Sequence, residues 1–138
     1  MIANTCYSFS KFLVFEQEQC ALYTQEQLKD LEKFADHLLK KWNIDIEFSK
    51  HFNERMSDSR NSPCIKLSEL QQLFKKISID HGEKIKSQND HQAVLKDIQS
   101  SLNLPFVIDI TNNHQSQVTM KTIMRKKDFK TSNSIINY

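Results

Sequence analysis

The chain contains almost no glycine. One glycine and two prolines occur among its 138 residues. Phosphate-binding loops, dinucleotide-binding turns and the nucleophile turn of α/β-hydrolases each need several glycines, because the backbone approaches a ligand closely or turns with a positive φ. Gly82 alone cannot supply such a loop. The sequence therefore excludes protein kinases, P-loop NTPases, Rossmann dehydrogenases and α/β-hydrolases.

Cysteine and long apolar runs are also scarce. Cys6, Cys20 and Cys64 lie far apart, form no C-x-x-C pair and have no histidine at the spacing of a zinc site. We therefore expect free thiols in a reducing compartment, with no metal and no cofactor. No run reaches the roughly 18 apolar residues that a membrane span needs, so we expect a cytoplasmic protein without a membrane partner.

The charge is nearly balanced overall but not along the chain. Nineteen basic residues oppose 17 acidic ones, which gives a formal net charge of +2. Between Met120 and Tyr138, however, five basic residues accompany a single acid. A basic segment of this kind attracts polyanions, of which phosphate backbones are the commonest. A lysine-rich edge strand that discourages aggregation would show the same pattern.

Residues 24–138 are expected to form a single domain, because a hydrophobic content of 38% is too high for a disordered chain. Residues 1–23 show no clear period and are interpreted as an N-terminal arm. A capping box at residues 24–27, followed by apolar residues at helical spacing, predicts an amphipathic helix that reaches Trp42. Its charged residues are expected on a solvated face, and Trp42 is expected to anchor the core.

Two more helices are predicted in the first half of the chain. After Asn43, three apolar residues recur one turn apart: Phe48, Phe52 and Met56. The polar residues 57–63 then predict a loop. A second capping box at residues 68–71 and the apolar residues behind it predict a third helix, which Gly82 is expected to end.

The second half of the chain has the pattern of strands. Residues 93–102 fit either a helix or a short strand, whereas residues 105–110 have the composition of a strand. Residues 111–116 predict a hairpin connection to a return strand over residues 118–125, and a further strand is expected after residue 129. Helices first and strands afterwards predict an α+β fold, with N-terminal helices followed by a small antiparallel β-sheet.

One set of polar residues is expected to form a catalytic groove. In the second helix, His51 and Arg55 are i,i+4 neighbours beside the buried stripe. In the return strand, alternation puts Lys121 and Arg125 on the face opposite the apolar side chains, with Thr122 between them in sequence. If this helix packs across the sheet, the imidazole and the cations converge. A histidine on a helix flank can also be purely structural, and that interpretation stays open.

Such a groove suits metal-independent cleavage of RNA. An imidazole can take the proton of a ribose 2′-hydroxyl or give one to the leaving 5′-oxygen. Guanidinium and ammonium groups stabilise the charge that develops on the phosphorane-like transition state. The 2′-hydroxyl is an internal nucleophile, so this chemistry needs no metal. Four further cations are expected to bind nucleic acid: Arg60, Lys126, Lys127 and Lys130.

The order of these motifs resembles the barnase–EndoU–colicin–RelE-like (BECR) nuclease fold of phage and toxin proteins. The resemblance spans residues 28–135 and is carried by three short motifs, residues 48–55 (FSKHFNER), residues 102–106 (LNLPF) and residues 121–131 (KTIMRKKDFKT), together with Ile65, Leu70 and Phe74 between the first two. It implies two helices before a four-stranded antiparallel sheet, with an early H-x-x-E-R motif facing a late basic strand. Carried over to this sequence, the catalytic residues would be His51, Arg55, Lys121, Thr122 and Arg125.

Three functions remain open from the sequence. As an enzyme, the protein would be a phage-encoded endoribonuclease that acts on RNA in the host cytoplasm, with an immunity or host protein as a partner. As a non-enzymatic module, it would be a phage structural or accessory protein, in the virion or the cell, whose basic C-terminal strand binds nucleic acid or a host protein. As an inhibitor of host defence, it would act by protein contact alone.

Overall fold

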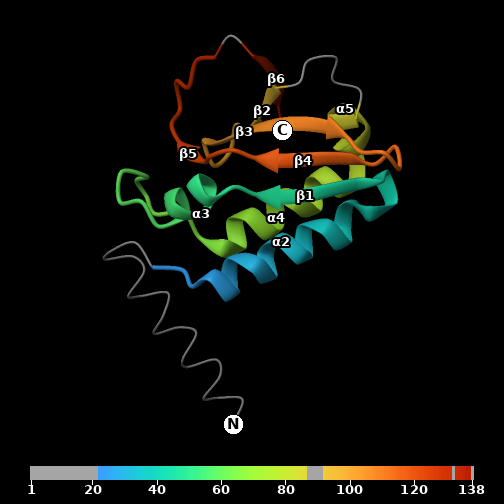
Figure 1. Cartoon of the computed structure of the whole chain (residues 1–138). Coiled ribbons are helices and arrows are strands. Elements are labelled where there is room, and N and C mark those ends of the chain that lie inside the picture. The colour runs from blue at the N-terminus through green and yellow to red at the C-terminus, as the bar shows by residue number, and fades with distance from the viewer. Residues whose placement is uncertain (1–21, 87–91, 132, 138) are drawn as a thin grey trace.

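The computed structural model describes residues 22–86, 92–131 and 133–137, in which helices pack beside a β-sheet (Figure 1). The helical elements are α2 (Gln25–Leu39), η1 (Lys40–Trp42), α3 (Lys50–Met56), α4 (Leu67–Lys76), η2 (Ile77–His81) and α5 (Gly82–Lys86). The strands are β1 (Ile44–Phe48), β2 (Gln92–Asp97), β3 (Leu102–Ile110), β4 (Ser116–Met120), β5 (Met124–Arg125) and β6 (Ser134–Asn137). The helices precede every strand except β1, which confirms the α+β class. No helix of this described part is long and apolar enough to cross a membrane.

The sheet is mixed, with the strand order β1-β4-β3-β2-β6 and with β5 paired to the start of β3. Strands β2, β3 and β4 pair antiparallel, as expected, but β1 pairs parallel with β4 and β6 pairs parallel with β2. The prediction of a purely antiparallel sheet is therefore wrong at both ends, because no local turn signal announces a parallel pair. The pairings make β1, β4, β2 and β6 run in one direction, so their carboxyl ends lie at the same end of the sheet. Figure 1 shows this common direction for β1 and β4.

Helix α2 begins at the predicted capping box. The Thr24 hydroxyl accepts a hydrogen bond from the Gln27 N–H at 3.1 Å, and the Gln27 side chain accepts one from the Thr24 N–H at 2.9 Å. These contacts satisfy N–H groups that the first turn of a helix leaves free. The helix buries one apolar stripe, which confirms its amphipathic character: Leu28, Leu31, Ala35 and Leu39.

Two acidic side chains of α2 bind the backbone of β1. The Glu32 carboxylate accepts a hydrogen bond from the Phe48 N–H at 2.6 Å, and the Asp36 carboxylate accepts one from the Ile46 N–H. β1 is the outermost strand of the described sheet, so these N–H groups face no neighbouring strand. The prediction that the charges of this helix lie on a solvated face is therefore wrong for Glu32 and Asp36.

Asp36 makes the stability of the fold depend on pH. Burial raises the pKa of the Asp36 carboxyl from 3.8 to about 6, although the bond from Ile46 opposes the rise and Asp45 adds to it. Because the folded protein holds this proton more tightly than the unfolded chain, the stabilising contribution is complete below the unfolded pKa and is lost as the pH rises through 6. We expect the free energy of unfolding to fall across this interval, and the Asp36→Asn variant to lose that part of the pH dependence.

Urea unfolding at a series of pH values between about 4 and 7 measures this effect. Asp30→Asn is the matched control, because Asp30 is an exposed carboxylate of the same helix. The control is expected to keep the pH dependence of the parent protein. An equal pH dependence in the Asp36→Asn variant would instead assign the effect to another group.

The predicted second helix starts later than Phe48. Phe48 is the last residue of β1, in which Ile44 and Ile46 are buried on one face at the period of a strand. The Ser49 hydroxyl then accepts a hydrogen bond from the Phe52 N–H at 3.0 Å and caps α3. Within α3 the apolar residues are buried, so this part of the predicted stripe is confirmed.

Helix α4 begins before the predicted capping box. Lys66 is its N-cap, and the Lys66 N–H donates to the Glu69 carboxylate at 2.9 Å, so the box at residues 68–71 is wrong. The helical path does not end at Gly82 either, because the chain continues through the π-helical turn η2 into α5. The buried stripe is the predicted one: Leu70, Leu73, Phe74 and Ile77.

The single glycine permits the close approach of Trp42. The φ of Gly82 is −57°, an ordinary helical value, but a Cβ there would lie only 2.3 Å from atoms of the indole ring. The Trp42 Nε1–H donates to the Ser78 carbonyl at 2.9 Å, which fixes the ring beside this turn. Trp42 also packs against the core, as predicted.

The hairpin predicted at residues 111–116 is present and joins β3 to β4. Residues 92–97 form the strand β2 and not a helix, and β6 supplies the strand expected after residue 129. Of the two possibilities that the sequence leaves open for this region, the structure therefore has the strand. Its pairing with both β3 and β6 places it inside the sheet, where its apolar residues are buried.

The predicted return strand is interrupted. β4 ends at Met120, and the short strand β5 resumes pairing with β3 only at residues 124–125. The alternation that puts Lys121 and Arg125 on the same face does not survive this break. It is wrong for Arg125, whose side chain is only 8% exposed, whereas Lys121 is exposed.

Candidate functional site

The end of the sheet where β1 and β4 finish brings two distant segments together. Ser49 follows β1, and its N–H donates to the Met120 carbonyl at 3.1 Å. The Ser49 hydroxyl donates to the Lys121 carbonyl at 2.8 Å. These two bonds hold the start of α3 against the residues that follow β4, so the predicted helix motif lies next to the late basic segment.

A pocket of about 360 Å³ opens between these two segments. Its lining contains six of the predicted site residues: His51, Arg55, Arg60, Thr122, Arg125 and Lys126. Lys121 and Lys130 are exposed outside its lining, and Lys127 lines a different pocket. The structure thus brings most of the predicted groove together but leaves Lys121 outside it.

His51 and Arg55 are in contact across one turn of α3. The Arg55 Nε–H donates to His51 Nε2 at 3.2 Å, and Glu54 Oε1 lies 4.0 Å from His51 Nδ1. A ring nitrogen that accepts a hydrogen bond carries no proton, so this contact fits the neutral imidazole with its proton on Nδ1, beside Glu54. The His51 side chain is 52% exposed and is accessible to a ligand in the pocket.

Asp58 holds two arginines of the pocket, a role that the sequence pattern did not predict. Arg55 Nη1 donates to Asp58 Oδ2 at 2.6 Å, and Arg60 Nη2 donates to the same oxygen at 2.8 Å. The Arg60 N–H also donates to Asp58 Oδ1 at 2.9 Å, as in an Asx turn. Arg60 remains 72% exposed, so Asp58 orients this side chain without burying it. The only sequence signal is an acid three residues after Arg55 in a polar turn.

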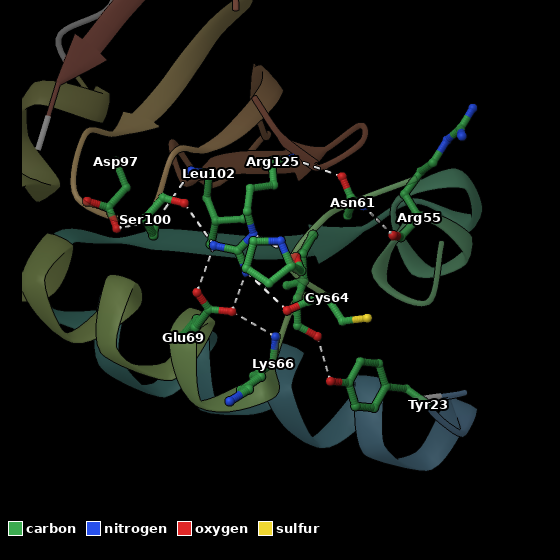
Figure 2. A network of polar contacts seen from close by, with 12 residues as sticks. Tyr23, Arg55, Asn61, Cys64, Lys66, Glu69, Asp97, Ser100, Leu102 and Arg125 are labelled. Carbon is green, nitrogen blue, oxygen red and sulfur yellow. Dashed lines mark hydrogen bonds and ion pairs between the residues drawn. The ribbon is translucent and has the colours of Figure 1, made fainter. Parts of the chain in front are cut away.

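Arg125 is buried in a network that uses all of its donors (Figure 2). Its Nε donates to the Pro63 carbonyl at 2.8 Å. Nη1 donates to Glu69 Oε1 at 2.9 Å and to the Ser100 carbonyl at 2.8 Å, while Nη2 donates to Glu69 Oε2 at 2.6 Å and to the Cys64 carbonyl at 3.1 Å. A guanidinium has five N–H groups, so none is left for a ligand in this conformation. Arg125 therefore forms part of the pocket wall.

Asn61 joins the two halves of the pocket. Its side-chain oxygen accepts a hydrogen bond from the Arg125 N–H at 2.9 Å, and its amide donates to the Arg55 carbonyl at 3.0 Å (Figure 2). Asn61 is only 7% exposed. One buried amide therefore ties the end of α3 to β5, and the sequence pattern marked it only as part of a loop.

Asn103 fixes the segment that carries Lys126. The Asn103 amide nitrogen lies within hydrogen-bond distance of three carbonyls, at 3.1 Å from Ser101, 3.3 Å from Met124 and 2.8 Å from Lys126. The Lys126 N–H also donates to the Ser101 carbonyl at 2.9 Å. Asn103 is fully buried in the sheet, so a buried amide holds the backbone of Lys126 in place.

The charge of the pocket favours an anionic ligand. Four cationic residues and the single acid Asp58 belong to its lining. Glu69, which is not part of this lining, neutralises Arg125, with 2.6 Å between Glu69 Oε2 and Arg125 Nη2. The remaining cations, Arg55, Arg60 and Lys126, outnumber Asp58, and an excess of this kind attracts phosphate groups.

Cys64 lies in the Arg125 network and takes part in a disulfide. The expectation of free thiols is therefore wrong for this residue, while Cys6 and Cys20 lie outside the described residues. Within the described part of the chain, no three His, Cys, Asp or Glu side chains gather closely enough to hold a metal ion.

The chain matches no protein-family model, no curated protein and no solved structure. The likeness to the BECR nuclease fold therefore stays a prediction carried by three short motifs. Two of these motifs contribute to the pocket, since His51 and Arg55 come from the first and Thr122 and Lys126 come from the last.

Proposed function

We propose that the protein is an endoribonuclease of the phage or toxin type, which cleaves RNA without a metal ion by attack of a ribose 2′-hydroxyl on the adjacent phosphodiester. The observation that carries this proposal is a pocket in which the His51 imidazole lies among three cationic side chains: Arg55, Arg60 and Lys126. The imidazole supplies proton transfer, and the cations supply charge stabilisation. Both are requirements of the reaction.

The contact between His51 and Arg55 gives each side chain a role. Arg55 Nε–H occupies His51 Nε2 at 3.2 Å, but a phosphate is a stronger acceptor for a guanidinium than a neutral imidazole is. When Arg55 turns to the phosphate, Nε2 becomes free to take the proton of the 2′-hydroxyl. The 2′-oxygen then bonds to phosphorus, the P–O5′ bond breaks, and the 5′-oxygen takes up a proton from water while the His51 imidazolium returns its proton to the solvent. The products are a 2′,3′-cyclic phosphate and a 5′-hydroxyl.

The remaining predicted residues contact RNA outside the proton-transfer step. Thr122 lines the pocket, where its hydroxyl can donate to a phosphate oxygen. Lys121, Lys127 and Lys130 are exposed and suit the phosphates that flank the cleaved bond. Arg125 keeps the structural role that its five protein acceptors give it.

Incubation of the purified protein with total RNA in EDTA tests the proposal. The protein is expected to release fragments with 2′,3′-cyclic phosphate ends, and His51→Ala is expected to lower the rate by about 10²–10⁴-fold, the usual contribution of a proton-transferring side chain. His37→Ala is the matched control, because His37 is an exposed residue of α2 outside the pocket lining. RNA that stays intact, or equal cleavage by the His51→Ala variant, would refute the proposed ribonuclease activity of this pocket.

A non-enzymatic protein that binds nucleic acid or a host protein is the second candidate, and the Asp58 contacts favour it. Asp58 Oδ2 already accepts hydrogen bonds from Arg55 at 2.6 Å and from Arg60 at 2.8 Å. Both guanidiniums would therefore stabilise the negative charge of a transition state less strongly. For a phage structural or accessory protein of this kind, Arg55→Ala and His51→Ala would reduce RNA affinity only modestly. Affinity measured beside the cleavage rate therefore separates the two candidates.

A further inference from the structure

A second pocket lies at the same end of the sheet, beside β2 and β6. It measures about 410 Å³ and is lined by Lys96, Asp97, Ile98, Ser101, Lys127 and Asn137. These residues come from the carboxyl ends of β2 and β6, from the turn before β3 and from the segment after β5. In the strand order they lie on the other side of β3 from β4 and β1, beside which the first pocket opens.

The two pockets share a wall made of consecutive residues. Lys126 lines the first pocket and Lys127 lines the second, and neighbouring Cα atoms are about 3.8 Å apart. The wall is held in place, because the Lys126 N–H donates to the Ser101 carbonyl at 2.9 Å and the Asn103 amide donates to the Lys126 carbonyl at 2.8 Å. A chain molecule that leaves the first pocket across Lys126 therefore meets Lys127 next.

The charge of the second pocket suits a phosphate. Lys96 and Lys127 supply two ammonium groups. The acid in its lining, Asp97, is already engaged, because its carboxylate accepts from the Ser100 hydroxyl at 2.7 Å and lies 3.6 Å from Lys76 Nζ. The Asp97 side chain is only 7% exposed, so it opposes an incoming anion less than an exposed carboxylate would.

We propose that the second pocket binds a nucleotide that flanks the cleaved bond, with its phosphate on Lys96 and Lys127 and its base against Ile98, which is 66% exposed. This proposal rests on the proposed ribonuclease function and defines its substrate as a single strand of several nucleotides. A single strand can bend across the Lys126–Lys127 wall and present an unstacked base. A duplex is stiff over this length and keeps its bases paired.

Fluorescence anisotropy with 2′-O-methyl oligouridylates tests the second pocket, because these strands have no free 2′-hydroxyl and cannot be cleaved. The probes are a dinucleotide and a strand of about ten nucleotides. The double variant Lys96→Gln/Lys127→Gln is expected to bind the long strand roughly tenfold more weakly and to bind the dinucleotide as the parent protein does. Two lost phosphate contacts should also reduce the slope of log affinity against log salt by about 1.4.

The double variant Lys33→Gln/Lys40→Gln is the matched control, because it removes the same charge from two exposed lysines of α2 and η1. It is expected to bind both probes like the parent protein. Three results would overturn nucleotide binding by the second pocket. They are equal weakening by the control, an unchanged affinity of the Lys96→Gln/Lys127→Gln protein for the long strand, and an equal loss of affinity for the dinucleotide.

These results are independent of cleavage, so the two proposals can fail separately. Suppose that cleavage depends on His51 but Lys96→Gln/Lys127→Gln does not change the affinity for the long strand. This result would refute nucleotide binding by the second pocket and support the ribonuclease function. The expected binding pattern without any cleavage of RNA would refute the ribonuclease, while the second pocket would keep its nucleotide contact.

Discussion

The Arg125→Met variant is expected to unfold with a free energy about 3–5 kcal/mol lower than that of the parent protein. The guanidinium joins three parts of the fold: α4 through Glu69, the loop before α4 through Pro63 and Cys64, and the β2–β3 turn through Ser100. Methionine retains an unbranched apolar stem but has no guanidinium and no donor. The substitution removes the charge partner of a partly buried carboxylate and one hydrogen-bond donor from each of three carbonyls. Removing only one member of a buried ion pair is strongly destabilising.

Urea unfolding of two further variants makes this prediction specific. Lys126→Met removes the neighbouring exposed cation and is expected to change the free energy of unfolding by less than about 0.5 kcal/mol. The double variant Arg125→Met/Glu69→Gln is expected to recover part of the loss, because no unpaired carboxylate remains. If Arg125→Met is as stable as Lys126→Met, the network does not hold the fold together, and Arg125 becomes available again as a ligand of the proposed RNA phosphate.

The Asn103→Asp variant is expected to lose about 3 kcal/mol or more of unfolding free energy near neutral pH. The amide nitrogen of Asn103 lies between three carbonyl oxygens, those of Ser101, Met124 and Lys126. Aspartate has nearly the same shape but puts a charged oxygen where a donor stood. It would bury an uncompensated charge in a fully buried position and repel all three carbonyls.

Asn113→Asp is the control for this change, because it adds the same charge at an exposed position of the β3–β4 hairpin. Thermal and urea unfolding are expected to show little effect of the control. The Asn103→Asp protein should regain stability at acidic pH, where the new carboxyl is protonated and can donate. Equal stability of the two variants at neutral pH would mean that the amide does not hold Lys126 in place.

The parts of the fold that could be predicted are those with a local pattern. Apolar residues at helical spacing mark α2 and α4, and turn-forming residues mark the β3–β4 hairpin. The contact between His51 and Arg55 could be predicted for the same reason, since residues four apart on a helix are neighbours. Strand β1 was not predicted, although the buried residues Ile44 and Ile46 are spaced as in a strand. Five residues give a weak period, and the parallel partner β4 is distant in sequence.

The polar supports of the pocket could not be predicted, because their partners are far away in the chain. Arg125 has the same sequence signature as an exposed cation, and only its approach to Glu69, 56 residues earlier, makes it a buried one. Asn61 lies 64 residues before the Arg125 N–H that it binds. Asp58 is nearer in sequence to its arginines. Acidic residues are common in polar turns, however, so the presence of one does not predict that it binds an arginine.

The packing of Trp42 against Gly82 gives the protein a built-in optical probe. Trp42 is the only tryptophan of the chain, and it lies just before β1, whereas the first pocket opens after the other end of that strand. The five residues of β1 separate the two by roughly 16 Å. Its fluorescence therefore reports the opening of the core at the end of the sheet remote from the proposed RNA site. An RNA titration that shifts this emission would reveal that occupancy of the pocket is transmitted along the sheet to the helices.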